Sequence, residues 1–280
     1  MSYVIAGKIP QGSVPRALYW DAQECYHYIR LQKFDDNFDL LIVGGEDHRT
    51  GQEHDTHAHR TRLEEWTRKH FPMVTSFEYG WSGQVMETVD GLGFIGHNPL
   101  DKDNVYVITG DSGMGMTHGT LGGMIVTDQI MDRKNPWAAL YAPNRKTLRA
   151  TGRYLQGTAN ALAQYTDWLS SADATEMNQI APDSGALLRH GLGKVAVYRA
   201  ASGELHKCSA TCPHLGAIVQ WNESDKTWDC PMHGSRFDKF GTVINGPANC
   251  DLGSVSDTEE TQANVALLAP PASLGPDRSL

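Results

Sequence analysis

Short apolar runs, separated by glycine-rich connections, dominate the first 145 residues. Three of these runs, Tyr3–Ile9, Asp39–Val43 and Val105–Thr109, have the length and composition of β-strands. Between them, Asp55–Phe71 carries a few apolar residues among many charges, which predicts one amphipathic helix. Strands mixed with a helix predict an α+β fold for this region.

The pattern changes after residue 145. Apolar residues recur at helical spacing over 146–170, which predicts a helical connector, and 171–182 has the composition of a polar linker. From 183 to about 270, short β segments alternate with Gly, Asn and Asp, which predicts a small all-β domain. Examples of these segments are Lys194–Tyr198, Trp228–Cys230 and Thr242–Ile244.

The predicted organisation therefore has three parts. Residues 1–145 form the first domain, 146–182 a helical connector and linker, and 183–270 the all-β domain. The Pro-rich tail, Ala269–Leu280, is expected to fray.

Composition narrows the class of partner. The chain has 24 Lys and Arg against 33 Asp and Glu, a net charge of −9, and an acidic chain repels phosphate backbones. We therefore expect no nucleic acid partner. No run approaches the ~18 apolar residues of a membrane-spanning helix, and the first residues lack the pattern of a secretion signal. These features favour a soluble cytoplasmic protein without a membrane partner.

Four of the five cysteines fall within one 43-residue window, which favours a metal over disulfides in a cytosolic chain. Cys212-Pro213-His214 is followed, after 15 intervening residues, by Cys230-Pro231-Met232-His233. Each loop supplies one thiolate and one imidazole, and such a set suits zinc or iron. Zinc fingers usually pair Cys with Cys and His with His, so this arrangement favours iron over zinc. Cysteines with a purely structural role are the least favoured interpretation.

The two loops closely resemble those of the Rieske iron–sulfur family, over about 187–251. The resemblance implies a [2Fe–2S] cluster in which Cys212 and Cys230 bind one iron, and His214 and His233 bind the other. It also implies a small antiparallel β fold with both loops at its tip and the histidines near solvent. The residues expected to shape the loops are Pro213, Gly216, Gly234 and Pro247.

Departures from the family pattern predict a low reduction potential. Rieske proteins of respiratory complexes carry a disulfide between the loops, but the matching positions here are Ala217 and Met232. Their serine donor is kept as Ser235, whereas their tyrosine donor is replaced by Phe237. Losing a donor leaves the reduced cluster less stabilised, so we expect the lower half of the Rieske range of about −150 to +300 mV.

The other cysteines and several histidines are not expected to bind metal. Cys208 and Cys250 are expected to be buried, inert thiols rather than ligands. Four histidines near the predicted helix start have ligand-like spacing but lie among charged residues, which favours a solvated polar face over a metal site. They are His48, His54, His57 and His59.

A second candidate site lies in the first domain. The strand ending at Asp111 runs into a glycine-rich turn, and a helix is expected to continue to Ile130. The amides at a helix N-terminus suit an anion or an electron-rich ring, although an ordinary strand–turn–helix connection is the alternative. His118, Trp81 and Gln84 are weaker candidates for this site, with backbone contacts or core packing as the plainer interpretation.

Three segments, 81–84, 90–96 and 109–115, resemble the C-terminal part of the D-amino-acid oxidase superfamily in order and spacing. Residues 41–48 and 135–141 are similar to the branch whose members end in a Rieske domain. The resemblance implies FAD, held here by a half-site only. The residues that would line the flavin are Gly110, Asp111, Ser112, Gly113, Met114, Gly115, Met116 and Thr117.

Members of that family begin with a strand, a G-x-G-x-x-G turn and a helix that hold the ADP half of FAD. We assign no such unit to this chain. Either a separate FAD-binding subunit supplies the missing half, or the chain is a truncated form.

The sequence thus predicts an iron–sulfur oxidoreductase that passes electrons through a Rieske cluster, coupled to flavin-dependent oxidation of a small amine or amino-acid-like substrate. A Rieske ferredoxin-like carrier, with the first half as a docking module, is the alternative, and a truncated product without turnover is the third. A redox partner protein is implied, and a homo-oligomer stays open. Rieske oxygenases place the cluster domain first, which disfavours that class.

Overall fold

The computed structural model describes residues 1–22, 26–145, 151–191 and 193–255. The chain divides into two compact units. The first contains 1–48 and 59–162, and the second contains 49–58 together with the chain from 163 onward. Helices and strands mix in the first unit and strands dominate the second, which confirms the predicted α+β class.

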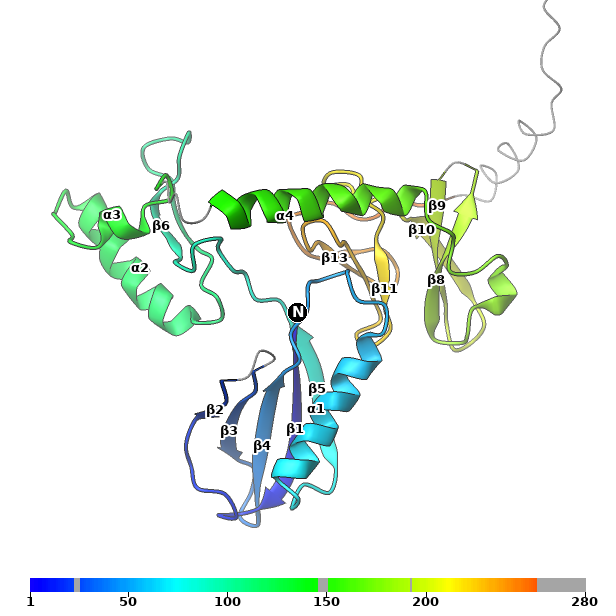
Figure 1. The fold of residues 1–280 in the computed structure, drawn as a ribbon, viewed down its shortest axis with the longest axis horizontal. Coiled ribbons are helices and arrows are strands. Elements are labelled where there is room, and N and C mark those ends of the chain that lie inside the picture. The colour runs from blue at the N-terminus through cyan, green and yellow to red at the C-terminus, as the bar shows by residue number, and fades with distance from the viewer. Residues whose placement is uncertain (23–25, 146–150, 192, 256–280) are drawn as a thin grey trace, which may run out of the picture. The chain divides into compact units, whose positions relative to one another are not determined.

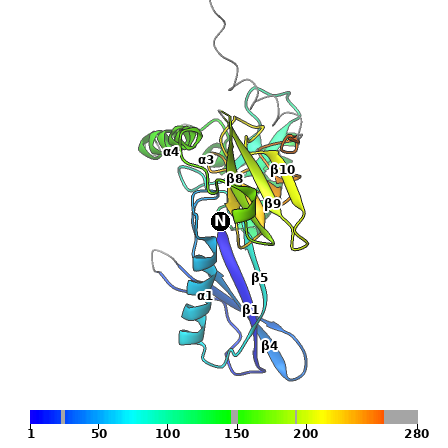
Figure 2. The same cartoon turned by 90° about the vertical axis from the view of Figure 1, so that its right-hand side faces the viewer.

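The first unit contains an antiparallel five-stranded sheet. The predicted strand at Tyr3–Ile9 lies within β1 (Ser2–Pro10), which pairs with a strand on each side, and α1 (Thr56–His70) lies along one face of the sheet, as Figures 1 and 2 show. The helix follows the predicted amphipathic segment 55–71 within one residue at each end. In spatial order the strands are β2 (Tyr19–Trp20), β3 (Tyr28–Lys33), β4 (Phe38–Gly45), β1 (Ser2–Pro10) and β5 (Phe77–Gly83).

Side-chain alternation along β1 decides which face of the sheet is covered. Tyr3 and Ile5 are fully or nearly fully buried in a cluster that includes Leu63 of α1. Val4 and Ala6 point to the opposite face, where they form a smaller buried cluster. The side chains of Tyr3 and Ile5 therefore contribute to the larger core, between the sheet and α1.

The glycine-rich region forms a small layer of its own. β6 (Phe94–His97) pairs antiparallel with β7 (Tyr106–Thr109), and α2 (Gly115–Ile130) packs on both strands. Gly122 of α2 stands against the side chain of Ile108, where a Cβ would approach to 2.7 Å. The short α3 (Ala138–Tyr141) contacts β6. The predicted strand, turn and helix ending at Ile130 are thus confirmed.

Arg145 holds the loop before β6 in place. Its guanidinium forms a two-pronged ion pair with Asp90, at 2.7 and 2.8 Å, and donates to the Gly93 carbonyl at 2.9 Å. It also lies 4.1 Å from the centre of the Phe94 ring. The Arg145 and Asp90 side chains are both only 8% exposed, so each charge depends on its partner.

The second unit contains two antiparallel sheets, and Figure 2 shows the strands of the first side by side. The first has the order β10 (Leu205–Ser209), β9 (Gly193–Arg199), β8 (Ser184–His190), and the second the order β11 (Gln220–Asn222), β12 (Thr227–Asp229), β13 (Arg236–Asp238), β14 (Val243–Asn245). Trp228 and Phe237 are cross-strand partners with no exposed surface at the centre of the core. The predicted segments at 194–198, 228–230 and 242–244 correspond to β9, β12 and β14.

The connecting region differs in part from the prediction. α4 (Thr151–Ala163) and the 3₁₀-helix η2 (Gln164–Trp168) form within the predicted helical connector. Residues 171–182 do not behave as a polar linker, because Ala174 and Ile180 are buried beneath β8 and a 3₁₀ turn, η3 (Met177–Gln179), forms between them. Residues 146–150 of the connector and the tail from 256 lie outside the described residues.

Among the described residues, no helix combines the length and apolar character needed to cross a membrane.

Replacing Arg145 by Met should destabilise the first unit by about 3–5 kcal/mol, because the Asp90 carboxylate, only 8% exposed, would lose the positive charge that lies beside it. Chemical denaturation of the variant measures this loss. Arg133→Met removes an ion pair in which the arginine is 55% exposed, and it should cost much less. Equal losses for the two variants would contradict the role of Arg145.

Candidate functional site

The two Cys–His loops share one hydrogen-bond pattern. In the first, the Cys212 N–H donates to the Ala217 carbonyl at 2.8 Å, and the Cys212 carbonyl accepts from the Gly216 N–H at 2.9 Å. The second loop, between β12 and β13, repeats both bonds around Cys230 at 2.8 and 3.0 Å. Gly216 and Gly234 adopt φ of 76° and 79°, a conformation that favours glycine. The repeated pattern turns both loops back on their cysteines.

The loops bring the four predicted ligands together in pairs. Cys212 and Cys230 are each 1% exposed, and their side chains are hydrogen-bonded to each other. The His214 and His233 rings lie 5.0 Å apart, nearly perpendicular, with His233 exposed. Nδ1 of His214 is buried without a hydrogen-bond partner among the described residues. A buried nitrogen lone pair of this kind suits a metal ligand.

The thiols polarise each other. The Cys230 thiol, the His214 backbone and Ser235 donate toward Cys212 and lower its pKa to about 6, against the effect of burial. The shared hydrogen bond with Cys212, together with burial, raises the pKa of Cys230. Burial, followed by the neighbouring His214, lowers the pKa of His233 and favours the neutral imidazole. A thiolate and neutral imidazoles are the forms that bind metals.

The pairing of the four side chains, two thiols and two imidazoles, matches the ligand set of a Rieske cluster. In the part of the chain that the structure describes, no three His, Cys, Asp or Glu side chains converge as a single metal ion would require. A Rieske cluster makes no such demand, because each iron takes two protein ligands and completes its coordination with sulfide. One buried thiol pair beside one imidazole pair satisfies that requirement.

The connector contributes contacts that the sequence did not reveal. Tyr165 of η2 donates its hydroxyl to the Leu215 carbonyl at 2.6 Å, and the Trp168 indole N–H donates to the Gly216 carbonyl at 2.9 Å. Both bonds support the first loop. Aromatic residues with polar tips at the end of a helical segment are a sign of such contacts, because buried Tyr and Trp usually find partners.

The departures from the respiratory pattern occupy core positions. Ala217 is buried, and Met232 is half-buried against the same core as Phe237. Ser235 has no exposed surface, and its hydroxyl accepts from the Ala248 N–H at 2.9 Å.

The remaining two cysteines differ from each other. Cys208 is buried as predicted, and burial, followed by the charge of Asp238, raises its pKa to about 12. Cys250 is exposed, so the prediction that it is buried was wrong. It lies in a loop beyond β14 where no strand or helix covers it.

This contrast predicts selective alkylation at pH 8. With a pKa of about 12, Cys208 holds only about one thiolate in ten thousand, so iodoacetamide should modify Cys250 and leave Cys208 intact. Peptide mapping by mass spectrometry after a short exposure measures both sites. Rapid modification of Cys208 in the folded protein would contradict its burial.

The predicted flavin-facing turn is exposed. After β7, left-handed conformations at Gly110, Ser112 and Gly113 reverse the chain before α2 begins. The Gly113 N–H donates to the Asp111 carboxylate at 3.3 Å, which places this charge beside the helix N-terminus. Of the eight predicted residues, those that are exposed are Gly113, Met114, Gly115, Met116 and Thr117.

The weaker candidates lie at different places. His118 is half-buried, and its ring packs against Gly93 and 6.1 Å from the centre of the Tyr141 ring. Trp81 is 46% exposed on β5, so core packing does not account for it, and Gln84 follows that strand.

One segment matches the dinucleotide-binding fingerprint in its sequence but not in its structure. Gly91-Leu-Gly93-Phe-Ile-Gly96 has the spacing G-x-G-x-x-G, which the sequence prediction missed. Residues 94–97 form β6, so this turn precedes a strand, whereas the fingerprint requires a helix. The described residues therefore contain no such dinucleotide unit at this position.

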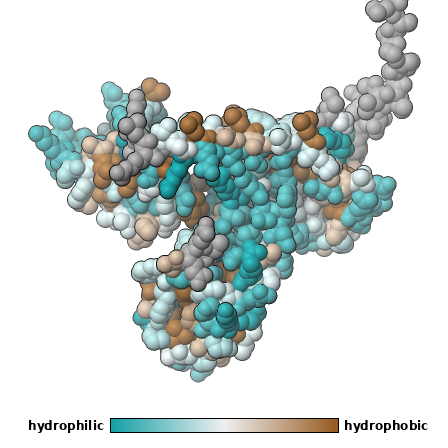
Figure 3. Space-filling view, in the orientation of Figure 1, coloured by the Kyte–Doolittle hydropathy of each residue, from teal (hydrophilic) through white to brown (hydrophobic). Residues whose placement is uncertain are grey.

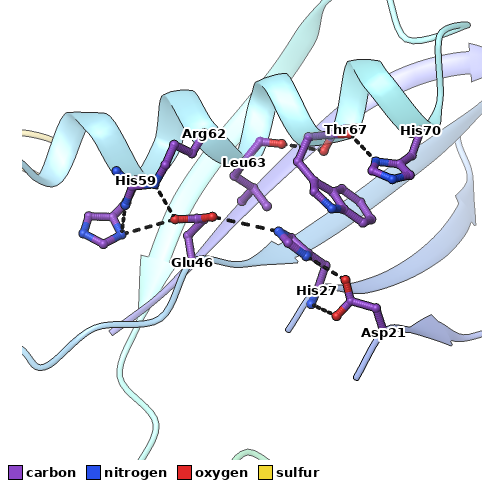
Figure 4. Close-up of polar contacts among 9 residues, drawn as sticks. Asp21, His27, Glu46, His59, Arg62, Leu63, Thr67 and His70 are labelled. Carbon is purple, nitrogen blue, oxygen red and sulfur yellow. Dashed lines mark hydrogen bonds and ion pairs between the residues drawn. The ribbon is translucent and has the colours of Figure 1, made fainter. Parts of the chain in front are cut away.

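The histidines near α1 are only partly solvated. His54 and His57 are exposed as predicted, but His59 is 8% exposed and stacks on Tyr3, because it lies one turn before the buried Leu63. Figure 4 shows that Glu46 lies between two histidines and an arginine of the first unit. Its carboxylate accepts from Arg62 at 2.7 Å and lies 3.6 Å from His59 and 4.0 Å from His27. The prediction of a fully solvated face was therefore wrong for His59.

Comparison with known families agrees with both halves of this description. Residues 2–129 match the DAO family of FAD dependent oxidoreductases, and residues 167–256 match the Rieske [2Fe-2S] domain. The two matches, in this order, agree with the predicted flavoprotein region followed by a Rieske domain. The two matches support FAD and a [2Fe–2S] cluster as its cofactors.

Individual relatives match different shares of the chain. The chain is 29% identical over 248 residues to YhfW of Bacillus subtilis (strain 168), whose name describes a Rieske 2Fe-2S iron-sulfur protein. That match covers 88% of this chain and 48% of the relative, so the chain spans about half of that protein's length. The cytochrome b6-f complex iron-sulfur subunit of Synechococcus elongatus is 46% identical over 50 residues, 18% of this chain and 28% of the subunit. Among solved structures, the cyanobacterial plasma membrane Rieske protein PetC3 from Synechocystis PCC 6803 is similar to part of this chain. The alignment covers 31% of this chain and 88% of the PetC3 chain, with 28% identity and a TM-score of 0.27.

Proposed function

We propose that this chain is the cluster-carrying half of a cytoplasmic flavin–Rieske oxidoreductase. Its ligands would be Cys212 and Cys230 on one iron, and His214 and His233 on the other. When bound, FAD takes electrons from a small amine or amino-acid-like substrate and the cluster transfers them singly to a redox partner protein. The observation that carries the proposal is the pairing of two buried thiols with two adjacent imidazoles in a chain that also matches a flavoprotein family.

The chain's own residues have distinct tasks in this proposal. The matched loops fix the thiols in a site that excludes water, where backbone N–H groups stabilise the sulfur atoms. The imidazole of His233 stays near solvent, so an electron can leave at the surface without crossing the core. The four described cysteines form no disulfide, which suits a reducing compartment such as the cytoplasm.

A FAD-binding partner region is supported by exposed apolar surface in the first unit. α2 is apolar over much of its length, yet only Gly122 and Ile125 are buried. A helix of this character is normally covered on most sides. Figure 3 shows hydrophobic atoms over the region of α2 and along α4. The exposed apolar side chains of α2 and the turn before it are Met114, Met116, Met124 and Ile130.

We propose that the segment covering α2 is the FAD-binding half that holds the ADP moiety, supplied by a separate subunit or by a further stretch of chain. Residues 110–117 would then face the flavin. The exposed N–H groups in the first turn of α2 suit the polar edge of a flavin ring.

The experiment is an absorbance and low-temperature EPR spectrum of protein purified without oxygen, before and after dithionite. The proposal predicts a Rieske-type signal in the reduced protein, and flavin bands once the FAD-binding half is present. A cluster signal without flavin, even with that half present, would favour the ferredoxin-like carrier or a truncated product without turnover. A colourless zinc-loaded protein would contradict the Rieske assignment.

His214→Cys tests the ligand assignment. An anionic thiolate in place of a neutral imidazole should change the cluster spectrum and lower its reduction potential, because the reduced state gains further negative charge. A redox titration followed by EPR measures both effects. His206→Cys, a change at a half-buried histidine on β10 outside the loops, is the control and should leave both unchanged. An unchanged spectrum and potential in His214→Cys would count against the ligand assignment.

A further inference from the structure

A short segment of the flavoprotein region belongs to the second unit. Residues 49–58 lie within the match to the FAD-dependent family, yet they group with the Rieske domain. The flanking residues, His48 and His59, belong to the first unit. The Rieske match covers residues 167–256 and does not include this segment. The contacts of residues 49–58 with the cluster loop are therefore not part of the matched Rieske domain.

Gly51 places this segment directly on the backbone of the second Cys–His loop. A Cβ at Gly51 would lie 2.6 Å from the Pro231 nitrogen and 2.8 Å from the Cys230 carbonyl carbon. Its φ of 70° is also in the left-handed region. Only glycine combines this backbone conformation with so close an approach. The segment therefore lies against the peptide bond that follows a predicted cluster ligand.

Gln52, the next residue, adds a hydrogen bond to the same loop. Its side-chain Nε2 donates to the Pro231 carbonyl oxygen at 2.9 Å. The same peptide unit carries the Met232 N–H, which donates to the Cys230 sulfur. Two hydrogen bonds in series therefore connect Gln52 to Cys230 Sγ through one peptide group.

Hydrogen bonds arranged in series strengthen one another. A donor at the carbonyl oxygen polarises the peptide, which makes its N–H a better donor to the acceptor on the other side. Hydrogen bonds to the cysteine sulfurs of an iron–sulfur cluster stabilise the more negative, reduced state and raise the reduction potential.

We propose that Gln52 is a positioning residue of the Rieske centre that raises the reduction potential through the Pro231–Met232 peptide. The inference rests on the proposed function only in that Cys230 is a cluster ligand. It gives a loop of the flavoprotein region a direct effect on the electron acceptor. A displacement of residues 49–58 would weaken the Met232 donor and make the cluster harder to reduce.

The test is Gln52→Met, which keeps the length of the side chain and removes the donor. The equilibrium constant for reduction should fall about three- to tenfold, which is about 30–60 mV at 59 mV per tenfold for one electron. A redox titration of the purified, cluster-containing full chain, followed by EPR, measures the potential. Gln52→Glu, a second variant of similar shape, should lower it at least as much, because a carboxylate adds negative charge.

Thr56→Val distinguishes tuning from simple attachment of the segment. The Thr56 hydroxyl accepts from the Ser224 N–H at 3.2 Å and ties the same segment to the second unit at a point away from the cluster loop. If Gln52 acts through the peptide, Thr56→Val should keep the wild-type potential. Equal falls in Thr56→Val and Gln52→Met would show a merely structural role and overturn the proposal.

The remaining outcomes separate this proposal from the assignment of the cluster. A wild-type cluster signal with an unchanged potential in both Gln52 variants would overturn the relay and leave the Rieske function intact. A wild-type protein without a Rieske signal would overturn both. If Gln52→Met loses its cluster, Gln52→Leu, which also removes the donor and adds no charge, decides: a lowered potential supports the relay, and cluster loss or an unchanged potential overturns it.

Discussion

The architecture of the second unit depends on bringing two cysteine side chains to one buried point while two histidine rings stay near the surface. The loops solve this problem with the same pair of backbone hydrogen bonds around Cys212 and Cys230 and with a left-handed glycine four residues after each. The core around Trp228 and Phe237 then holds the strands from which the second loop emerges. The two buried thiols are hydrogen-bonded to each other, and backbone N–H groups donate to both sulfur atoms. In the proposed function, one cluster would take both thiols and the lone pair of His214 together.

The proposed function joins the two units through the chemistry of their cofactors. A flavin takes electrons in pairs and a Rieske cluster carries them singly, so in this proposal a flavin held by the first unit would be the electron donor of the cluster. The exposed apolar residues of α2 indicate that the first unit presents surface for a partner region. Residues 49–58 add a physical contact, because a segment of the flavoprotein region lies on the cluster loop through Gly51 and Gln52.

Much of this molecule follows from local sequence pattern. The length and composition of the apolar run Tyr3–Ile9 were sufficient to place a strand, because both faces of β1 are buried over most of its length. The Cys–His spacing predicts the ligand set through its resemblance to the Rieske family, since a [2Fe–2S] cluster of that kind takes two thiolates and two imidazoles. The strand–turn–helix at 106–130 was predicted because glycines mark the turn and the flanking segments have clear periods.

The failures come from tertiary contacts. The contact of Gln52 with Pro231 joins positions 179 residues apart, and no local pattern encodes it. The polar composition of 171–182 concealed Ala174 and Ile180, which are buried because β8 lies above them. His59 is buried for the same kind of reason, since helical spacing places it beside Leu63 on the face that meets the sheet.

The most direct test of the central claim is pulsed EPR of the dithionite-reduced protein grown with ¹⁵N-histidine. Two histidine nitrogens bound to one cluster should give two ¹⁵N couplings, and changing His214 or His233 should remove one of them. This result would establish that the facing imidazoles share a [2Fe–2S] centre with the buried thiols. A reduced protein without histidine couplings, or without any cluster signal, would contradict the account.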